Sequence, residues 1–266
     1  MPPRYRLPKQ SLRAARSRAA VAATPVPARR PESYASYFAP TGRALVPPGM
    51  LLRLDPDWQE ERILLERGYR FVAGVDEVGR GCLAGPVVAG AVVLPRGWAP
   101  DGLRDSKLLD ADTRERLADQ IRARAVAWAV AEVEAAVIDG INILQATLLA
   151  TTLAAARLPV RPDALILDAV CLTEILLHQR VLIDADRLSP SVAAASVIAK
   201  VHRDRLMTDL DARYPGYGFA SHKGYACPEH RAAIEALGVS PLHRRSFAPC
   251  THARDADSVA LWEDDR

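Results

Sequence analysis

The feature that most constrains the fold is an uninterrupted apolar run, PVVAGAVVL, at residues 86–94. Its composition is typical of a β-strand buried on both faces, so other elements must cover each side of it. Two more β-rich runs flank it, at residues 70–76 and 125–133. Apolar residues form 49% of the sequence, which is enough for a sizeable core.

Helical and strand-like segments alternate around and after these runs. Helices are expected over residues 57–67, 112–124 (with Asp112 or Thr113 near the start), 141–156, and from Ser189, which caps free amides ahead of Pro190, to Tyr214. Short apolar strands are expected at residues 163–167 and 180–183. This order predicts an α/β fold around a mixed sheet. Polar residues interrupt residues 141–160 too often for a lipid-facing helix, so we expect a packed helix and no membrane association.

The N-terminal segment, residues 1–50, is rich in Ala, Pro and Arg and has no sustained helical or strand period. Its first 30 residues carry eight basic and no acidic side chains; subtracting these from the formal charge of +3 leaves the rest at −5. We interpret it as a disordered extension before a catalytic domain at residues 51–250 and a frayed tail at residues 251–266. The extension suits a basic tether to nucleic acid, an organelle transit peptide, or a solvated segment without a role.

Four cysteines, at positions 82, 171, 227 and 250, form no Cys-x-x-Cys pair. A zinc knuckle and a dense disulfide framework are therefore not supported. Reduced thiols in a cytoplasmic protein fit this pattern best.

Carboxylates follow two of the expected strands. Asp76 and Glu77 end the first strand, and Asp168 ends a later one, where open α/β sheets place ligand-binding groups. Neighbouring strand residues point to opposite faces, so Asp76 and Glu77 can share a metal only if the strand ends or kinks between them, and the glycines that follow supply such a break. Read alone, Asp168 is equally suited to a turn.

Asp204 lies inside the long helix, one turn after Lys200, where a surface ion pair is the simpler interpretation. Together the four carboxylates offer a hard oxygen site for Mg²⁺ or Mn²⁺. Two such ions activate water and stabilise the leaving oxygen in phosphodiester hydrolysis, and metal reconciles acidic ligands with an anionic substrate.

Eight motifs in a fixed order resemble the type 2 ribonuclease H family, specifically bacterial ribonuclease HII. They are GVDEVGRG (74–81), LAGPVV (83–88), DSK (105–107), INILQATLL (141–149), AAASVIAKV (193–201), YPGYGF (214–219), HKGY (222–225) and HRRSF (243–247). The resemblance spans roughly residues 69–247. It implies an RNase H-like fold with a central five-stranded sheet and a C-terminal helical part, and metal ligation by Asp76, Glu77, Asp168 and Asp204.

The resemblance also implies how substrate is recognised. The loop Gly79, Arg80 and Gly81 would read a ribonucleotide 2′-hydroxyl through backbone groups, and Tyr225 would pack on the adjoining deoxyribose. Basic candidates for contact with the phosphate backbone are Arg80, Lys107, Lys200, Arg203, His222 and Lys223, and Ser106 and Ser196 are candidate neutral donors. The expected partner is an RNA–DNA hybrid, or duplex DNA with an embedded ribonucleotide, bound by a monomeric chain.

Two departures from the family pattern stand out. Ala169-Val170 follows Asp168 where the family has a glycine, and Ala226-Cys227 replaces a Gly-Thr pair. The first could shift the backbone at a metal ligand, and the second could remove a hydroxyl near the substrate.

Three other functions are conceivable for such a sequence. The glycine loop fits neither nucleotide-binding pattern, G-x-x-x-x-G-K-[ST] nor G-x-G-x-x-G, which argues against a nucleotide-binding enzyme. A non-catalytic binding module would be favoured by loss of a carboxylate, yet all four are present. A nuclease that requires several consecutive ribonucleotides remains the alternative to one that incises at a single ribonucleotide.

Overall fold

The computed structural model describes residues 55–256. Its centre is a five-stranded sheet in the order β3-β2-β1-β4-β5, with bounds β1 Val72–Val78, β2 Val87–Val93, β3 Ala127–Val133, β4 Ala164–Asp168 and β5 His178–Leu182. The first three strands are antiparallel neighbours, and β4 and β5 run parallel to β1. This mixed sheet confirms the expected α/β architecture. The interpretation of residues 1–50, and that of the tail beyond residue 256, lie outside the described residues.

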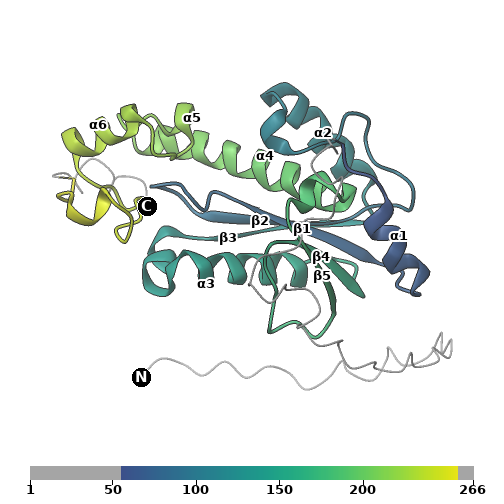
Figure 1. Ribbon diagram of the computed structural model, residues 1–266. Coiled ribbons are helices and arrows are strands. Elements are labelled where there is room, and N and C mark those ends of the chain that lie inside the picture. Colours follow the sequence, from purple (N-terminus) through teal and green to yellow (C-terminus); the bar gives the residue numbers. More distant parts are fainter. Residues whose placement is uncertain (1–54, 257–266) are drawn as a thin grey trace, which may run out of the picture.

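Helices cover both faces of the sheet. They are α1 Gln59–Glu66, α2 Ala111–Arg124, α3 Ala135–Ala156, α4 Pro190–Arg213, α5 Phe219–His222 and α6 Pro228–Leu237. Figure 1 shows α4 on one face and α3 on the other, with α5 and α6 gathered at one end as a C-terminal helical part.

Helix α4 lies unusually close to the two central strands. A Cβ added to Gly74 on β1 would come within 2.1 Å of the Ser191 backbone, and one on Gly90 of β2 within 2.5 Å of the Ala195 carbonyl oxygen. Only glycine permits this approach, because any larger residue would push the helix away. The first turns of α4 are therefore fixed over β1 and β2.

Helix α3 packs the opposite face through small residues. Ala146, Ala150 and Ala154 are fully buried against β1, β2 and β3. By length and composition α3 alone among the described helices could cross a membrane, and 28% of its most apolar window is buried. Its packing against the sheet agrees with the expected packed helix.

Several element boundaries differ from those expected. Helix α3 begins at Ala135 rather than residue 141, because its first turns are joined to the rest across a kink where Asn142 adopts φ 68°. The side chain that caps α2 is Asp110, which accepts from the Thr113 amide, and not Asp112 or Thr113. Strands β3 and β5 begin two residues away from their expected starts.

The start of α4 is held by a buried carboxylate from α1. Ser189 caps the helix as expected, accepting from the Val192 amide, and Pro190 follows it. Glu61, which is 1% exposed, accepts from the Ser189 hydroxyl at 2.6 Å and from the Ser191 amide at 3.0 Å. A carboxylate there satisfies a free amide and faces the positive end of the helix dipole.

Replacing Glu61 by Ala should lower the free energy of unfolding by roughly 2–3 kcal/mol, because two charge-assisted hydrogen bonds at a buried helix start are lost. Urea unfolding followed by circular dichroism would measure the change. Glu66→Ala, on the exposed side of the same helix, is the matched control and should change stability by no more than about 0.5 kcal/mol. Equal effects of the two substitutions would contradict this role of Glu61.

Candidate active site

The carboxylates Asp76 and Asp168 lie at neighbouring positions of the adjacent parallel strands β1 and β4. The register pairs Val75 of β1 with Leu167 of β4, so the next residues on the two strands are these two aspartates. Because paired residues of parallel strands point to the same face, both side chains face α4. Gly90, the partner of Asp76 on β2, faces α4 as well. Asp168 is the last residue of β4, as expected, whereas Asp76 lies two residues before the end of β1.

Glu77 lies on the same strand, and here the structure corrects the expectation. Strand β1 continues through Glu77 to Val78, and the break follows at Gly79, whose φ is +89°. No kink therefore separates Asp76 from Glu77, yet the two carboxylates lie near enough for the charge of Glu77 to raise the pKa of Asp76. The Glu77 carboxylate instead accepts a hydrogen bond from Arg80 at 3.0 Å.

The electrostatics of this strand end are unfavourable without a cation. Burial raises the pKa of Asp76 well above its usual range, and the charges of Glu77, Asp168 and Asp186 raise it further, against a hydrogen bond with Ser196. Burial likewise raises the pKa of Glu77, and Arg80 offsets part of the effect. The set therefore holds more negative charge than its neighbours neutralise.

Asp168 is oriented by the turn that precedes α4. Burial raises its pKa, while the Ala185 amide donates to its carboxylate at 3.1 Å and lowers it. The next residue, Ala169, has φ 52° and its amide donates to the Leu182 carbonyl at 2.7 Å. The alanine thus adopts a left-handed conformation that a glycine would take without strain.

Replacing Ala169 by Gly should raise the free energy of unfolding by on the order of 1 kcal/mol, because a Cβ in the left-handed region is removed. Denaturant midpoints would measure it. Ala123→Gly, at an exposed position inside α2, should instead destabilise by a similar amount, since glycine is a poor helix former. Destabilisation by both substitutions would show that Ala169 is not strained.

Asp204 forms a second group with cationic and aromatic neighbours. Lys200 donates to it at 2.7 Å, which confirms the expected ion pair one helical turn apart, and Arg114 of α2 lies 3.9 Å away. The Lys200 ammonium also lies 5.5 Å from the ring centroid of Tyr225, which is 41% exposed. The structure thus places Asp204, Lys200 and Tyr225 together.

The segment Asp105 to Lys107 approaches the carboxylates from across α4. The hydroxyls of Ser106 and Ser196 lie 2.9 Å apart, beside Asp76. Partial burial lowers the pKa of Lys107, but the charges of Asp105, Asp186, Asp76 and Asp168 outweigh it and raise the pKa overall. The charges of Asp76 and Asp168 therefore act on the exposed ammonium of Lys107.

Asp186 is a member of this cluster that the sequence did not single out. Burial and the charge of Asp105 raise its pKa to about 6. It lies in a short 3-10 helix, Ala185–Arg187, whose position depends on the turn between β5 and α4. No periodicity or motif marks such a residue, so only the fold could reveal it.

The backbone carbonyls of the glycine loop are bound by Arg244. Arg244 donates to the carbonyls of Gly79 at 2.7 Å and Arg80 at 2.8 Å. A Cβ added to Gly81 would meet nothing within 4 Å, so this side of the loop is open. Within residues 55–256, no hydrogen-bond acceptor is found for the amides of Arg80 and Gly81.

Lys223 and Tyr225 lie in the turn that adjoins this loop. The Leu83 amide donates to the Gly224 carbonyl at 2.8 Å, which fixes the two segments together. The Lys223 ammonium is bound to the Thr208 hydroxyl at 2.7 Å and to the Ala220 carbonyl, so it is engaged within the protein. Of the two, Tyr225 is the residue that faces outward.

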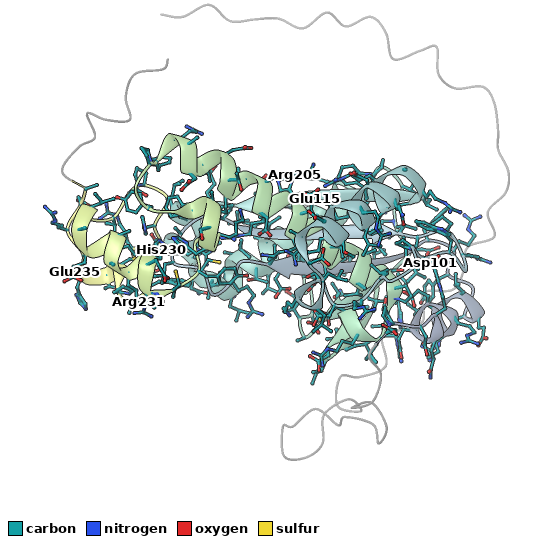
Figure 2. The ribbon with its side chains drawn as sticks, turned by 90° about the horizontal axis from the view of Figure 1, so that it is seen from above. Asp101, Glu115, Arg205, His230, Arg231 and Glu235 are labelled. Carbon is teal, nitrogen blue, oxygen red and sulfur yellow. The ribbon has the colours of Figure 1, made fainter. Side chains whose placement is uncertain are left out.

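Buried histidines fix the Tyr225 turn from the C-terminal part, where Figure 2 places His230 near Arg231 and Glu235. The Ser240 amide donates to Nδ1 of His243, so Nε2 of His243 donates to Nε2 of His230, and Nδ1 of His230 donates to the Tyr225 carbonyl. Burial lowers the pKa of His230 to about 4 and that of His243 to about 3. Both are therefore neutral links at physiological pH.

The departure at Cys227 has a structural role. Its thiol caps α6 by accepting from the His230 amide at 3.4 Å. A threonine hydroxyl could make the same bond more strongly. The cysteine thus weakens a helix start rather than removing a group that faces open space.

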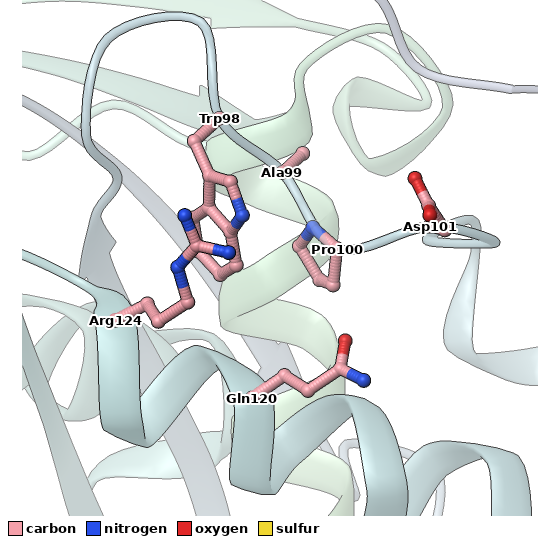
Figure 3. Close-up of a pocket in the computed structure, with 6 residues that line it drawn as sticks. All are labelled: Trp98, Ala99, Pro100, Asp101, Gln120 and Arg124. Carbon is pink, nitrogen blue, oxygen red and sulfur yellow. The ribbon is translucent and has the colours of Figure 1, made fainter.

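A separate pocket lies away from these residues. It has a volume of about 410 Å³ and is lined by Trp98, Ala99, Pro100, Asp101, Gln120 and Arg124, with the Arg124 guanidinium 4.4 Å from the Trp98 ring (Figure 3). Trp98 follows the end of β2 that pairs with the beginning of β1. The carboxylates lie at the other end of β1, so this pocket is not part of their site.

The donor set fits a divalent cation by its chemistry. Carboxylate oxygens are the ligands that Mg²⁺ and Mn²⁺ prefer, and a cation would relieve the repulsion among Asp76, Glu77 and Asp168. In the part of the chain that the structure describes, no three Asp, Glu, His or Cys side chains already converge at ligand spacing. Glu77 and Asp204 would have to exchange Arg80 and Lys200 for metal.

Comparison with known proteins agrees with this geometry. Residues 73–250 match the family model described as Ribonuclease HII. The ribonuclease HII of Desulfitobacterium hafniense strain Y51 is 50% identical over 203 residues, covering 76% of this chain and 78% of that protein. A ribonuclease HII of Thermus thermophilus is 53% identical over 184 residues, covering 69% of this chain and 89% of that protein.

Solved structures share the fold. Ribonuclease H2 from Pyrococcus horikoshii OT3 aligns with a TM-score of 0.59 at 26% identity, covering 68% of this chain and 96% of that one. Bst-RNase HIII in complex with Mn²⁺ aligns with a TM-score of 0.54 at 25% identity, covering 68% of each chain. The shared fold thus places the chain in the ribonuclease H class of nucleases. The chain belongs to the ribonuclease HII family, and it is an endoribonuclease that acts on the RNA of RNA–DNA hybrids.

Proposed function

We propose that this endoribonuclease is metal-dependent and that it also incises 5′ to single ribonucleotides embedded in duplex DNA, leaving 3′-hydroxyl and 5′-phosphate ends. Its cellular role would be removal of such ribonucleotides in the cytoplasm, by a monomer without membrane association. The observation that carries the proposal is the close attachment of the glycine loop to the Tyr225 turn. The loop directly follows β1, the strand that carries Asp76 and Glu77.

Asp76, Glu77, Asp168 and Asp204 would hold two Mg²⁺ or Mn²⁺ ions. When bound, such ions activate a water molecule and stabilise the leaving 3′-oxygen. Mn²⁺ is present in the related Bst-RNase HIII complex. Asp76, Glu77 and Asp168 repel one another across β1 and β4, and Asp204 lies on α4, where Lys200 donates to it.

The protein's own groups supply recognition. The open amides of Arg80 and Gly81 can donate to a 2′-hydroxyl, the group that distinguishes RNA from DNA, without sensing the base. Tyr225 presents an exposed ring on which a deoxyribose can pack. Lys107 and Lys200 are placed to neutralise phosphate, while Ser106 and Ser196 offer hydroxyls beside Asp76. Lys223 would contribute through its backbone, since its ammonium is engaged.

The test is cleavage of a DNA duplex that contains one ribonucleotide, mapped at nucleotide resolution with Mg²⁺, Mn²⁺ or chelator. We expect a metal-dependent nick on the 5′ side. Asp204→Asn should lower the rate at least roughly 100-fold, the upper end of the loss seen when a metal ligand's support is removed. Asp209→Asn, the same substitution at an exposed position of α4, should leave the rate unchanged.

Other outcomes would each overturn a different part. Cleavage restricted to hybrids with continuous RNA would remove single-ribonucleotide recognition. Cyclic phosphate products would exclude attack by water, because they arise from the 2′-hydroxyl. A near-normal rate for Asp204→Asn would remove this residue from the metal site.

Metal binding can be tested without activity. At a metal concentration about 100 times Kd, Mn²⁺ or Mg²⁺ should add about 2.7 kcal/mol to the free energy of unfolding. The gain should grow from about pH 5 to about pH 8, because carboxylates with raised pKa values must lose protons to bind metal.

The variant Asp76→Asn should be more stable than the wild type when a chelator removes metal. It should melt at a higher temperature than the wild type at neutral pH, because a buried charge repelled by its neighbours is removed, yet it should gain little from metal. Thermal unfolding with and without metal measures both effects. A variant that is destabilised in chelator and still stabilised by metal would contradict the proposed ligand set.

A further inference from the structure

Two arginines beneath the glycine loop are fully buried without an acidic partner. Arg203 and Arg244 each have 0% exposed surface. Neither forms an ion pair with a carboxylate in residues 55–256. Burying a charge in this way is costly unless every donor is satisfied, so the contacts of the two side chains are informative.

Arg244 binds the glycine loop and also Gly85, which follows it. Its Nη2 donates to the Gly79 carbonyl at 2.7 Å and its Nη1 to the Arg80 carbonyl at 2.8 Å. Its Nε donates to the Gly85 carbonyl at 3.1 Å. One rigid guanidinium therefore fixes the path of the loop from where β1 ends to where β2 approaches.

Arg203 joins the segment that follows the glycine loop to the Tyr225 turn. Its Nε and Nη2 donate to the carbonyls of Pro86 and Ala84, both at 3.0 Å, and its Nη1 donates to the Lys223 carbonyl at 2.8 Å. Its guanidinium lies 6.0 Å from the centroid of the Tyr225 ring. One side chain thus holds the Tyr225 turn against the segment that follows the glycine loop.

The fit of Arg203 against the loop is close. A Cβ added to Gly79 would lie 2.3 Å from Arg203 Nε. With the carbonyls of Gly79 and Arg80 directed at Arg244, the amides of Arg80 and Gly81 are what the loop offers outward. The two arginines therefore set both the orientation of the loop and its distance from Tyr225.

We propose that Arg203 and Arg244 are positioning residues that set the preference for a ribonucleotide followed by a deoxyribonucleotide over continuous RNA. This rests on the proposed reading of the 2′-hydroxyl by the loop and of the deoxyribose by Tyr225. Continuous RNA presents a 2′-hydroxyl at every position, so its cleavage tolerates a change in the distance between the loop and Tyr225. A junction places the 2′-hydroxyl and the deoxyribose at one fixed spacing, so its cleavage does not tolerate such a change.

The test uses Arg244→Lys and Arg203→Lys in the full chain, which keep the charge but lose the forked donors. For each variant, kcat/KM is measured on a duplex with one ribonucleotide and on a hybrid with continuous RNA. The ratio of the two values, the junction preference, should fall at least about tenfold, since two or more charge-assisted hydrogen bonds are lost. Tyr225→Ala provides the reference for lost junction reading.

Tyr217→Phe is the matched control for damage to the C-terminal part. It removes the hydrogen bond that the buried Tyr217 hydroxyl donates to the Gly238 carbonyl at 3.1 Å, away from the loop. It should lower stability without changing the junction preference. An arginine variant that loses activity equally on both substrates, as a purely structural defect would, overturns the proposal.

Failure of this inference is distinguishable from failure of the proposed function. If Tyr225→Ala leaves the junction preference of the wild type unchanged, the proposed reading is wrong. If Tyr225→Ala lowers it and the folded lysine variants do not, only the positioning role is wrong.

Should the lysine variants not fold, Gly85→Ala replaces them. Its Cβ would lie 2.4 Å from Met207 Sδ and displace the Gly85 carbonyl from Arg244, and an unchanged preference there would also overturn the role.

Discussion

The close contact between helix α4 and the two central strands is the constraint on which the rest of the structure depends. Gly74 and Gly90 let the helix backbone rest directly on β1 and β2. That contact buries Asp76 beneath the helix and brings Ser196 to it. It also directs the later turns of α4 past the strand end, where Lys200, Arg203 and Asp204 meet the loop and the Tyr225 turn.

The site combines a cluster of crowded negative charges with two buried positive charges nearby. Asp76, Glu77 and Asp168 crowd negative charge at one strand end, which favours a metal cation. Arg203 and Arg244 place buried positive charge under the adjoining loop and satisfy it with backbone carbonyls. In the proposed function, the first arrangement would hold metal at the reacting phosphate, and the second would give the proposed recognition loop a fixed shape. Selection of a sugar through backbone contacts would need such rigidity.

Much of this organisation could be predicted from the sequence. The apolar runs predicted the strands, and the position of Asp76 and Asp168 after two of them predicted their meeting at one edge. Element boundaries were less accurate where local rules compete. Asn142 adopts a left-handed conformation inside an otherwise helical segment, and Asp110 caps α2 ahead of the residues expected to do so. Ala169 adopts a left-handed backbone conformation in spite of its Cβ. The absence of a glycine at this position did not reveal that conformation.

By itself the sequence determined the α/β class, and its ordered motifs singled out the four carboxylates and the loop with Tyr225 as candidates, because strand periodicity and motifs are local properties. Only the tertiary structure decided that β1 continues through Glu77, that Asp186 joins the acidic set, and that Arg203 and Arg244 lie under the loop. Each of these depends on segments far apart in the chain. A buried arginine and a solvated one have the same sequence signature, and only packing distinguishes them.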